Sequence, residues 1–254
     1  MLIEVVQTVD RALNILELLS ESNNGMGITE ISDSVKLHKS TVHRLLGTLI
    51  YKGFVLQDMA TNKYKISLKL YELGMRKIDK SQISNVSKSY TKALMEKLNE
   101  VVHLVIRDKN DIVYIDKVEA NNTIRMASNI GKRSPLYCTA VGKVMLAFMP
   151  NEEVQKIWEN TKIEKLTDKT IIDFNEFKRE LIKIKSIGYA IDDEENEIGI
   201  RCIGAPVFNR NREIEGAISI SGPSNRVLRE DVEKYAKEVK KYAYLISKEL
   251  GYRE

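Results

Sequence analysis

The stretch that most constrains the fold is residues 27–52, GITEISDSVKLHKSTVHRLLGTLIYK. In its second half, apolar residues recur at the spacing of one helical face: Val42, Leu45, Leu46, Leu49 and Ile50. A shorter helix precedes it, with Ile31 and Val35 on one face and Thr29 as its expected N-cap. Only residues 36–38 separate the two patterns. Two helices joined by so short a turn predict a helix-turn-helix.

The polar face of the second helix has the chemistry of a DNA-reading surface. No acid lies between Lys36 and Lys52. Ser40 or a neighbour is expected to cap the helix. Arg44 can form two hydrogen bonds with a guanine edge, whereas hydroxyls and lysines can bind phosphates or flanking bases. This face therefore fits a major groove, and the residues expected to contact DNA are Lys36, Lys39, Ser40, Thr41, His43, Arg44, Thr48 and Lys52. The alternative is a helical pair of some other core, with its charges solvated.

A β-hairpin is predicted directly after this pair of helices. Residues 54–56 and 64–66 are strand-like and flank the polar tip 57–63. Lys63 and Lys65 lie on this hairpin and could contact phosphates or the minor groove. The hairpin favours a winged helix-turn-helix over the alternative.

The composition is that of an ordinary globular protein. A length of 254 residues, with 43% hydrophobic residues and four prolines, is enough for two domains with real cores. The formal charge of +4 is mild, so affinity for a polyanion would depend on local placement. We expect a cytoplasmic protein, because the first residues do not resemble a signal peptide and no apolar run of about 18 residues occurs. The two cysteines lack CxxC spacing and fit a reducing compartment.

Residues 8–21 predict a first helix with two apolar faces. Thr8 is the expected cap, and the expected core stripe is Val9, Ala12, Leu13, Leu16 and Leu19. Ile15 and Leu18 lie off that stripe. They either pack on another copy of the domain or complete a broad core face.

The remainder of the chain predicts an α+β domain on an antiparallel sheet, because its strands pair mainly as hairpins between helices. Residues 68–80 predict a helical linker. Strands are expected at 101–107, 112–118, 123–128, 189–191, 202–208 and 214–221, and helices at 86–98, 140–149, 151–158, 174–186 and 228–250. The expected domains are 1–68 (winged helix-turn-helix), 69–82 (linker) and 83–254 (second domain).

Over almost its full length, the chain resembles the IclR family of bacterial transcriptional regulators. TVDRALNILELL, GITEIS and HKSTVHRLLGTLIYKGFV resemble the family's winged helix-turn-helix. LYCTAVGKVMLAF, GYAIDDEENEIGIRCIGAPVF and GAISISGPSNRV resemble its effector-binding domain. The resemblance implies a ligand-responsive DNA-binding protein with a GAF-like second domain, assembled as a homodimer or a tetramer of two dimers. By family precedent alone we expect a repressor. We predict that two reading heads, paired through the first helix, place two recognition helices in successive major grooves of a palindromic operator.

The resemblance also implies an effector pocket on the sheet of the second domain, for a small organic acid or aromatic metabolite. Carried over by motif, its residues are Ala140, Val141, Asp192, Cys202, Ser219 and Ser221. The N–H groups around Ala140, Val141 and Gly142 would be first-turn donors for an anion. Two serines two residues apart on a strand face the same side. Ionised Asp192 would accept a hydrogen bond from a ligand hydroxyl, which favours a hydroxy or keto acid. Met126 and Ile200 are expected to add apolar lining.

Three alternatives remain open for the second domain. The serines, the cysteine and the acid run could be ordinary strand, core and loop residues. Cys138 or Cys202 with His103 could form a thiol enzyme, or bind a transition metal together with Asp192. A DNA-binding protein without an effector is the third possibility. No local motif supports catalysis, so we expect no enzyme activity, no cofactor and no metal.

Overall fold

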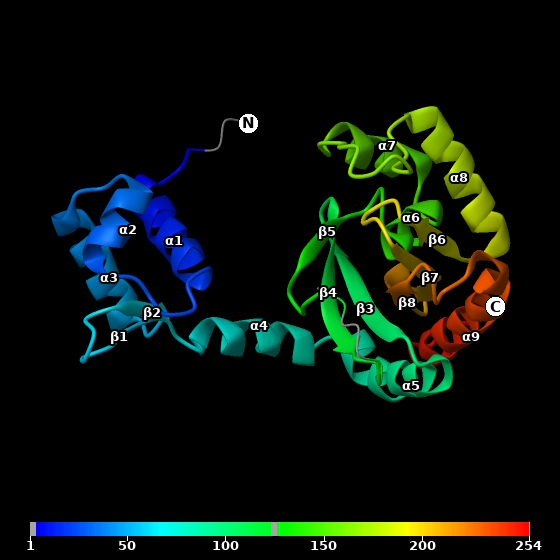
Figure 1. Cartoon of the computed structure of the whole chain (residues 1–254), viewed down its shortest axis with the longest axis horizontal. Coiled ribbons are helices and arrows are strands. Elements are labelled where there is room, and N and C mark those ends of the chain that lie inside the picture. Colours follow the sequence, from blue (N-terminus) through cyan, green and yellow to red (C-terminus); the bar gives the residue numbers. More distant parts are fainter. Residues whose placement is uncertain (1–3, 123–125, 127, 254) are drawn as a thin grey trace. The chain divides into compact units, whose positions relative to one another are not determined.

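The structure is a computed structural model that describes residues 4–122, 126 and 128–253. The chain divides into two compact units, Met1–Lys80 and Ser81–Glu254 (Figure 1). Each unit has its own hydrophobic core. Within the described residues, no helix is both long and apolar enough to cross a membrane.

The first unit is a helix-turn-helix followed by a hairpin. Its elements are α1 (Gln7–Ser20), α2 (Ile28–Val35), α3 (Lys39–Tyr51), β1 (Val55–Gln57), β2 (Tyr64–Ile66) and α4 (Lys69–Asp79). The two strands are antiparallel, as predicted. The predicted stripe of the second helix is confirmed in α3, where the buried residues are Val42, Leu45, Leu46 and Leu49. Ile50 at the end of the stripe remains 37% exposed.

The side-chain caps predicted for α2 and α3 are wrong. α2 begins after Gly27, whose N–H donates to the Glu30 carboxylate at 2.7 Å. Thr29 therefore lies inside the helix, and the acceptor comes from the first turn instead. α3 begins after His38, which forms no side-chain cap, and Ser40 is the second helical residue.

α1 uses a different face from the one predicted. Its core residues are Ile15, Leu16 and Leu19, with Ala12 and Leu18 partly buried. Val9 and Leu13, predicted for the core, are 56% and 53% exposed. Thr8 is not a cap, because the helix begins at Gln7 after Val6. Two overlapping stripes satisfy the helical period equally well, and packing against α2, α3 and β2 selects one of them.

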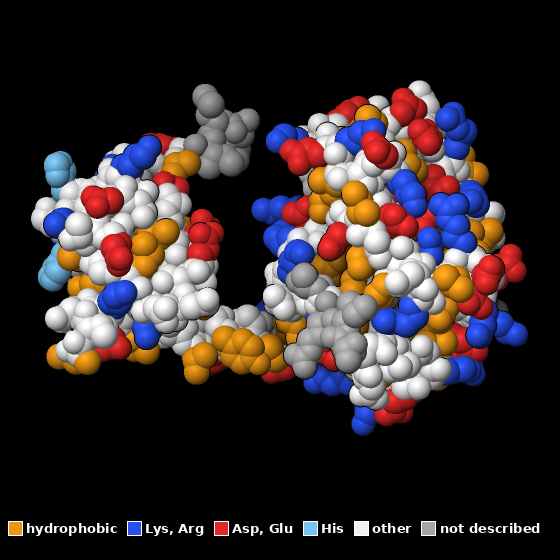
Figure 2. Space-filling view, viewed as in Figure 1, with side chains coloured by type: hydrophobic (Ala, Val, Ile, Leu, Met, Phe, Trp, Pro, Cys, Tyr) orange, Lys and Arg blue, Asp and Glu red, His pale blue; other side chains and the backbone are white. Residues whose placement is uncertain are grey.

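α4 confirms the predicted helix at 68–80 and is anchored to the end of α3. The Lys69 ammonium donates to the Lys52 carbonyl at 2.6 Å and lies 5.2 Å from the Phe54 ring centroid. No residue of α4 is buried. Figure 2 shows hydrophobic side chains gathered over this helix, and the exposed ones in this segment are Leu68, Leu70, Tyr71 and Leu73.

The second unit is built on a six-stranded antiparallel sheet, which confirms the predicted α+β class. The strand order is β5-β4-β3-β8-β7-β6. The strands are β3 (Val101–Asp108), β4 (Asp111–Val118), β5 (Arg133–Pro135), β6 (Ala190–Asp193), β7 (Ile200–Phe208) and β8 (Ile214–Pro223). β5 was not predicted. Of the expected strand 123–128, residues 123–125 and 127 lie outside the described residues, and residues 126 and 128 are not in a strand.

Helices cover both faces of this sheet (Figure 1). They are α5 (Gln82–Leu98), α6 (Ala140–Ala147), α7 (Asn151–Glu159), α8 (Phe174–Ile187) and α9 (Val232–Glu249), with a 3₁₀ turn at Arg229–Asp231. A β-carbon on Gly216 would meet Ile83 of α5, whereas one on Gly204 would meet the backbone of α6. Gly204 pairs with Ser219, three residues after Gly216 on β8, so α5 and α6 lie on opposite faces.

Candidate functional site

The exposed face of α3 carries most of the residues expected to contact DNA. Exposed side chains are Lys36, Lys39, Ser40, His43, Arg44, Thr48 and Lys52, and Thr41 is half-buried. Lys36, in the left-handed conformation with φ of 53°, ends α2 and begins the turn. On the wing, Lys65 is exposed and lies 4.0 Å from Asp58, while Lys63 is half-buried.

The beginning of α3 offers free backbone donors. No side chain caps the helix, and the N–H groups of Thr41 and Val42 bond to the His38 carbonyl. Within the described residues, the N–H groups of Lys39 and Ser40 have no acceptor. Free N–H groups at a helix N-terminus bind anions such as phosphates. The missing cap therefore suits this end of α3 for contact with a DNA backbone.

Two features of α3 were not recognised in the sequence. Gly47 lies on the exposed face, and a β-carbon there would meet nothing within 4 Å. No packing within the described chain therefore requires a glycine. Tyr51, at the end of the helix, is 83% exposed. Gly47 and Tyr51 follow Arg44 by about one and two helical turns, so they lie on the same side of the helix as Arg44.

In the second unit, β6, β7 and β8 align three polar residues across the sheet. Asp192 pairs with Cys202, and Cys202 pairs with Ser221. Ser219 pairs with Gly204 on one side and with His103 on the other. Cross-strand partners share a face of the sheet, so both rows point toward α6.

The N-terminus of α6 lies directly on these rows because Gly204 has no side chain. A β-carbon there would be 3.0 Å from the Val141 nitrogen. Thr139 caps the helix, and its hydroxyl accepts from the Gly142 N–H at 3.2 Å. The expectation of three free donors is therefore wrong for Gly142. The N–H groups of Ala140 and Val141 have no acceptor among the described residues.

A pocket forms between α6, the polar rows, Met126 and Ser128, with an empty volume of about 560 Å³ that includes its open mouth. Every predicted effector residue except Gly142 lines it, namely Met126, Ala140, Val141, Asp192, Ile200, Cys202, Ser219 and Ser221. The lining residues not predicted for this role are His103, Tyr114, Ser128, Lys132, Ser134, Thr139, Asn196 and Glu197. Thr139, Asn196 and Glu197 lie within the motifs quoted above but were not singled out there. The other five lie outside those motifs, so only the fold brings them to the pocket.

His103 is a neutral hydrogen-bonding group at the base of this pocket. Its Nε2 lies 2.7 Å from the Ser128 hydroxyl and its Nδ1 lies 3.3 Å from the Ser221 hydroxyl. Burial, and secondarily the Lys117 ammonium, lower the pKa of His103 to about 3. The ring can therefore donate one hydrogen bond and accept another at neutral pH.

Asp192 is the buried acid of the pocket. It is 3% exposed, and its Oδ1 accepts from the N–H groups of Glu195 at 2.8 Å and Asn196 at 3.3 Å. Burial and the Glu195 carboxylate raise the pKa of Asp192 to about 7, against the opposing effect of Lys143. Near neutral pH this carboxyl group can therefore hold a proton.

The two thiols do not have the environment of a nucleophile. Burial is the main cause that raises the pKa of both Cys138 and Cys202, and the Asp192 carboxylate adds to it. A catalytic cysteine needs a stabilised thiolate. Among the described residues, no three His, Cys, Asp or Glu side chains are grouped to hold a metal ion.

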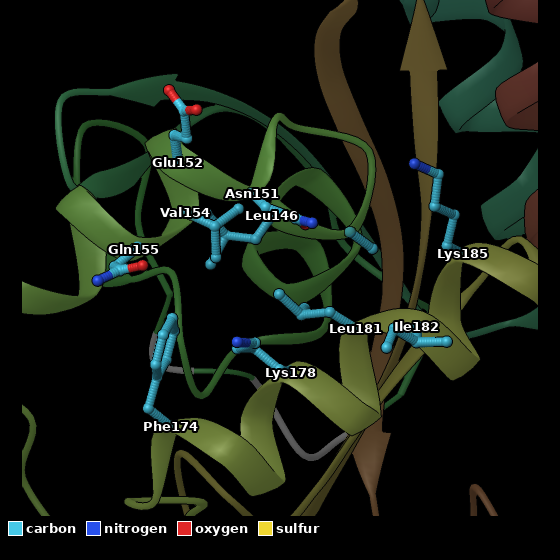
Figure 3. A pocket seen from close by; sticks show the side chains of 11 residues that line it. Leu146, Asn151, Glu152, Val154, Gln155, Phe174, Lys178, Leu181, Ile182 and Lys185 are labelled. Carbon is cyan, nitrogen blue, oxygen red and sulfur yellow. The ribbon is translucent and has the colours of Figure 1, made fainter.

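A separate hollow lies between α6, α7 and α8 (Figure 3). Its apolar wall includes Leu146, Val154 and Leu181, and Lys178 and Lys185 approach its edge. None of the predicted site residues lines it. Its polar lining residues, Asn151, Glu152, Gln155, Lys178 and Lys185, come from helices, whereas every predicted effector residue except Gly142 lies in the pocket on the sheet.

Comparison with known families gives matches to both units. The model described as "IclR helix-turn-helix domain" matches residues 8–59, and the model described as "Bacterial transcriptional regulator IclR C-terminal" matches residues 75–248. The HTH-type transcriptional regulator KdgR of Escherichia coli K12 is 36% identical, and the match covers 98% of this chain and 94% of that protein.

Solved structures show the same fold. The IclR of Thermotoga maritima superposes with a TM-score of 0.84 at 35% identity, covering 98% of this chain and 100% of that one. An IclR homolog from Microbacterium hydrocarbonoxydans, solved in complex with 4-hydroxybenzoate, gives a TM-score of 0.83 at 18% identity, covering 96% and 98% of the two chains. The latter likeness bears on the fold alone.

Proposed function

The chain belongs to the IclR family of bacterial transcriptional regulators, and we propose that it represses transcription from a palindromic operator under the control of a small organic acid. Residues 1–68 would read DNA, residues 69–82 would link, and residues 83–254 would bind the effector. Repression is the mode that the resemblance to the family implies. A role on chromosomal DNA would place the protein in the cytoplasm.

The exposed face of α3 supports the proposed DNA contact most strongly. It combines Arg44 with lysines at both ends and carries no acid. In the major groove, Arg44 would bind a guanine edge while Lys39, Lys52 and the free N–H groups bind phosphates. Lys65 on the wing would reach the neighbouring backbone.

The pocket supports a small acid as the effector. Two free N–H groups of α6 and the hydroxyls of Ser219 and Ser221 are donors that a carboxylate accepts from. Asp192 and His103 can bind hydroxyl or keto oxygens, depending on their protons. Met126 and Ile200 add apolar surface. A hydroxy or keto acid satisfies these groups better than an apolar ligand.

A dimer would place two copies of α3 in successive major grooves. The exposed apolar residues of α1, Val9 and Leu13, together with Val5 and Val6 before it, offer a surface for a second copy. Ile15 and Leu18, which were the alternative candidates for this contact, pack in the core instead. The effector would act by binding one spacing of the two reading heads better than another, with a coupling of about 1–3 kcal/mol.

Two measurements test the proposal. Selection from a randomised DNA duplex pool should yield a palindrome, and recovery of unrelated sequences would contradict operator binding. Thermal unfolding against keto, hydroxy, sugar and aromatic acids should identify an acid that stabilises the protein, because a ligand that binds only the folded state must do so. The Ser219→Ala/Ser221→Ala variant should lose that stabilisation. No stabilisation by any acid would favour a DNA-binding protein without a small-molecule effector.

A further inference from the structure

A buried ammonium group lies behind the effector pocket. Lys143 on α6 is 1% exposed, and its Nζ pairs with Oε1 of Glu195, which is 7% exposed. Oε2 of the same carboxylate is buried and has no hydrogen-bond partner within the described residues. A lysine is seldom fully buried unless it is paired, so this ion pair is a specific feature of the site.

The segment that carries Glu195 is fixed to Asp192 and to the preceding loop. The Thr167 hydroxyl donates to the Glu194 carbonyl at 2.7 Å, and the Thr170 hydroxyl donates to the Glu195 carbonyl at 2.6 Å. The Glu195 N–H donates to Asp192 Oδ1. The two carboxyl groups therefore stay close to each other and to one ammonium group.

Two buried carboxylates and one buried ammonium leave one negative charge without compensation. Such a charge is costly, and a pair of coupled acids relieves it by keeping a proton. Burial and the Glu180 carboxylate raise the pKa of Glu195, whereas Lys143 bonds directly to Glu195 and favours its ionised form. Asp192 borders the pocket, and within the described residues it forms no ion pair. The proton therefore belongs on Asp192.

Among the described residues, the other titratable groups around Asp192 do not supply the missing positive charge. Tyr114, Cys138 and Cys202 are neutral because burial raises their pKa values, and His103 is neutral because burial lowers its pKa. At the mouth of the pocket, the exposed side chains of Lys132 and Glu197 have opposite charges.

We infer that Asp192 enters the effector complex as a protonated carboxyl group that donates a hydrogen bond to an oxygen of the effector, and that Lys143 and Glu195 set its proton affinity. The inference rests on the proposed function in taking the effector to be a carboxylate. A carboxylate at the Ala140 and Val141 N–H groups adds a further negative charge beside Asp192. Binding therefore increases the proton affinity of Asp192, and the complex takes up a proton from solvent.

The first test follows Asp192 in the protein without ligand. In full-length protein labelled with ¹³C at aspartate carboxyl carbons, the Asp192 signal, assigned with Asp192→Asn, should titrate near neutral pH. Lys143→Met should move the midpoint up, and Glu195→Gln should move it down. General loss of structure does not shift a midpoint in two opposite directions. Lys185→Met, which removes an exposed lysine of α8, should leave it unchanged.

If Lys143→Met fails to fold, the nearly isosteric Glu195→Gln variant still decides the point, because it removes one charge and leaves Lys143 in place. Ionisation of Asp192 down to pH 5, or no downward shift in Glu195→Gln, would overturn the inference.

The second test counts protons on binding of pyruvate and 4-hydroxybenzoate. Titration calorimetry at pH 8, in phosphate and in Tris, should show uptake of up to one proton per acid bound. Kd should rise by up to about tenfold per pH unit above pH 7. Binding without proton uptake would overturn the inference. If Asp192 titrates as expected but neither these two acids nor any keto, hydroxy, sugar or aromatic acid of the thermal-unfolding panel binds, the proton on Asp192 stands and the proposed carboxylate effector is contradicted.

Discussion

A β-carbon added to Gly204 would lie 3.0 Å from the backbone nitrogen of Val141, closer than ordinary van der Waals contact. This contact joins the centre of β7 to the first turn of α6, where two N–H groups face the pocket. The close approach of α6 to β7 therefore requires that residue 204 be a glycine.

Gly204→Ala should push the first turn of α6 away from Ser219 and weaken binding of any acid that stabilises the wild type. The added methyl also overpacks the site, at a cost of about 1–3 kcal/mol in free energy of unfolding. Thermal unfolding with and without that acid measures both effects. Full stabilisation by the acid in the variant would show that α6 does not contact it.

Gly47→Ala is the matched substitution at a glycine with free space. Gly47 lies inside α3 with nothing within 4 Å of an added β-carbon, and glycine destabilises a helix by roughly 0.5–1 kcal/mol relative to alanine. The unfolding transition of the first unit should rise accordingly, with no change in acid binding. A lower transition would mean that Gly47 packs against something in solution, such as a second copy.

The buried stripe of α3 could be predicted because four apolar residues at helical spacing leave only one face to bury. The face of α1 could not, since its two stripes differ only in what they pack against. Motifs predicted Asp192, Cys202 and the two serines, which the fold gathers in one pocket. His103 and Ser221, separated by 118 residues, meet only through the pairing of β3 with β8. Lys143 and Glu195, 52 residues apart, likewise meet only in the folded chain.

Removal of single lysines from the DNA-binding face should weaken binding to all sequences alike. Lys39→Ala and Lys52→Ala each remove one cation from an exposed position. The slope of log K against log salt concentration should fall by about 0.9 for each phosphate that the variant no longer neutralises. Fluorescence anisotropy across a series of salt concentrations measures the slope. Lys185→Ala on α8 is the control, and an equal fall in that variant would contradict a local effect on DNA.

Arg44→Ala should instead reduce sequence preference. If Arg44 binds a guanine edge, its loss costs roughly 1–3 kcal/mol on the operator and much less on random DNA. Competition of operator and random duplexes measures the ratio. Equal losses on both would reassign Arg44 to a phosphate.

His103 and Asp192 should give opposite slopes to the dependence of stability on pH. The pKa of His103 falls from 6.5 to about 3 on folding. Between these values the unfolded chain binds more protons than the folded chain. The free energy of unfolding that neutral His103 contributes is therefore lost as pH falls below 6.5. The pKa of Asp192 rises from 3.8 to about 7. Between these values the folded chain binds more protons than the unfolded chain. The free energy of unfolding that protonated Asp192 contributes is therefore present below pH 3.8 and is lost as pH rises to 7.

Removing one group at a time separates the two slopes. Between pH 4 and 6.5, His103→Gln should make the free energy of unfolding fall more steeply with rising pH than in the wild type. Asp192→Asn should make it rise more steeply instead. Urea unfolding at each pH measures both. Because the side chains line one pocket, an unchanged slope in both variants would mean that water reaches the pocket freely and relieves the burial that shifts their pKa values.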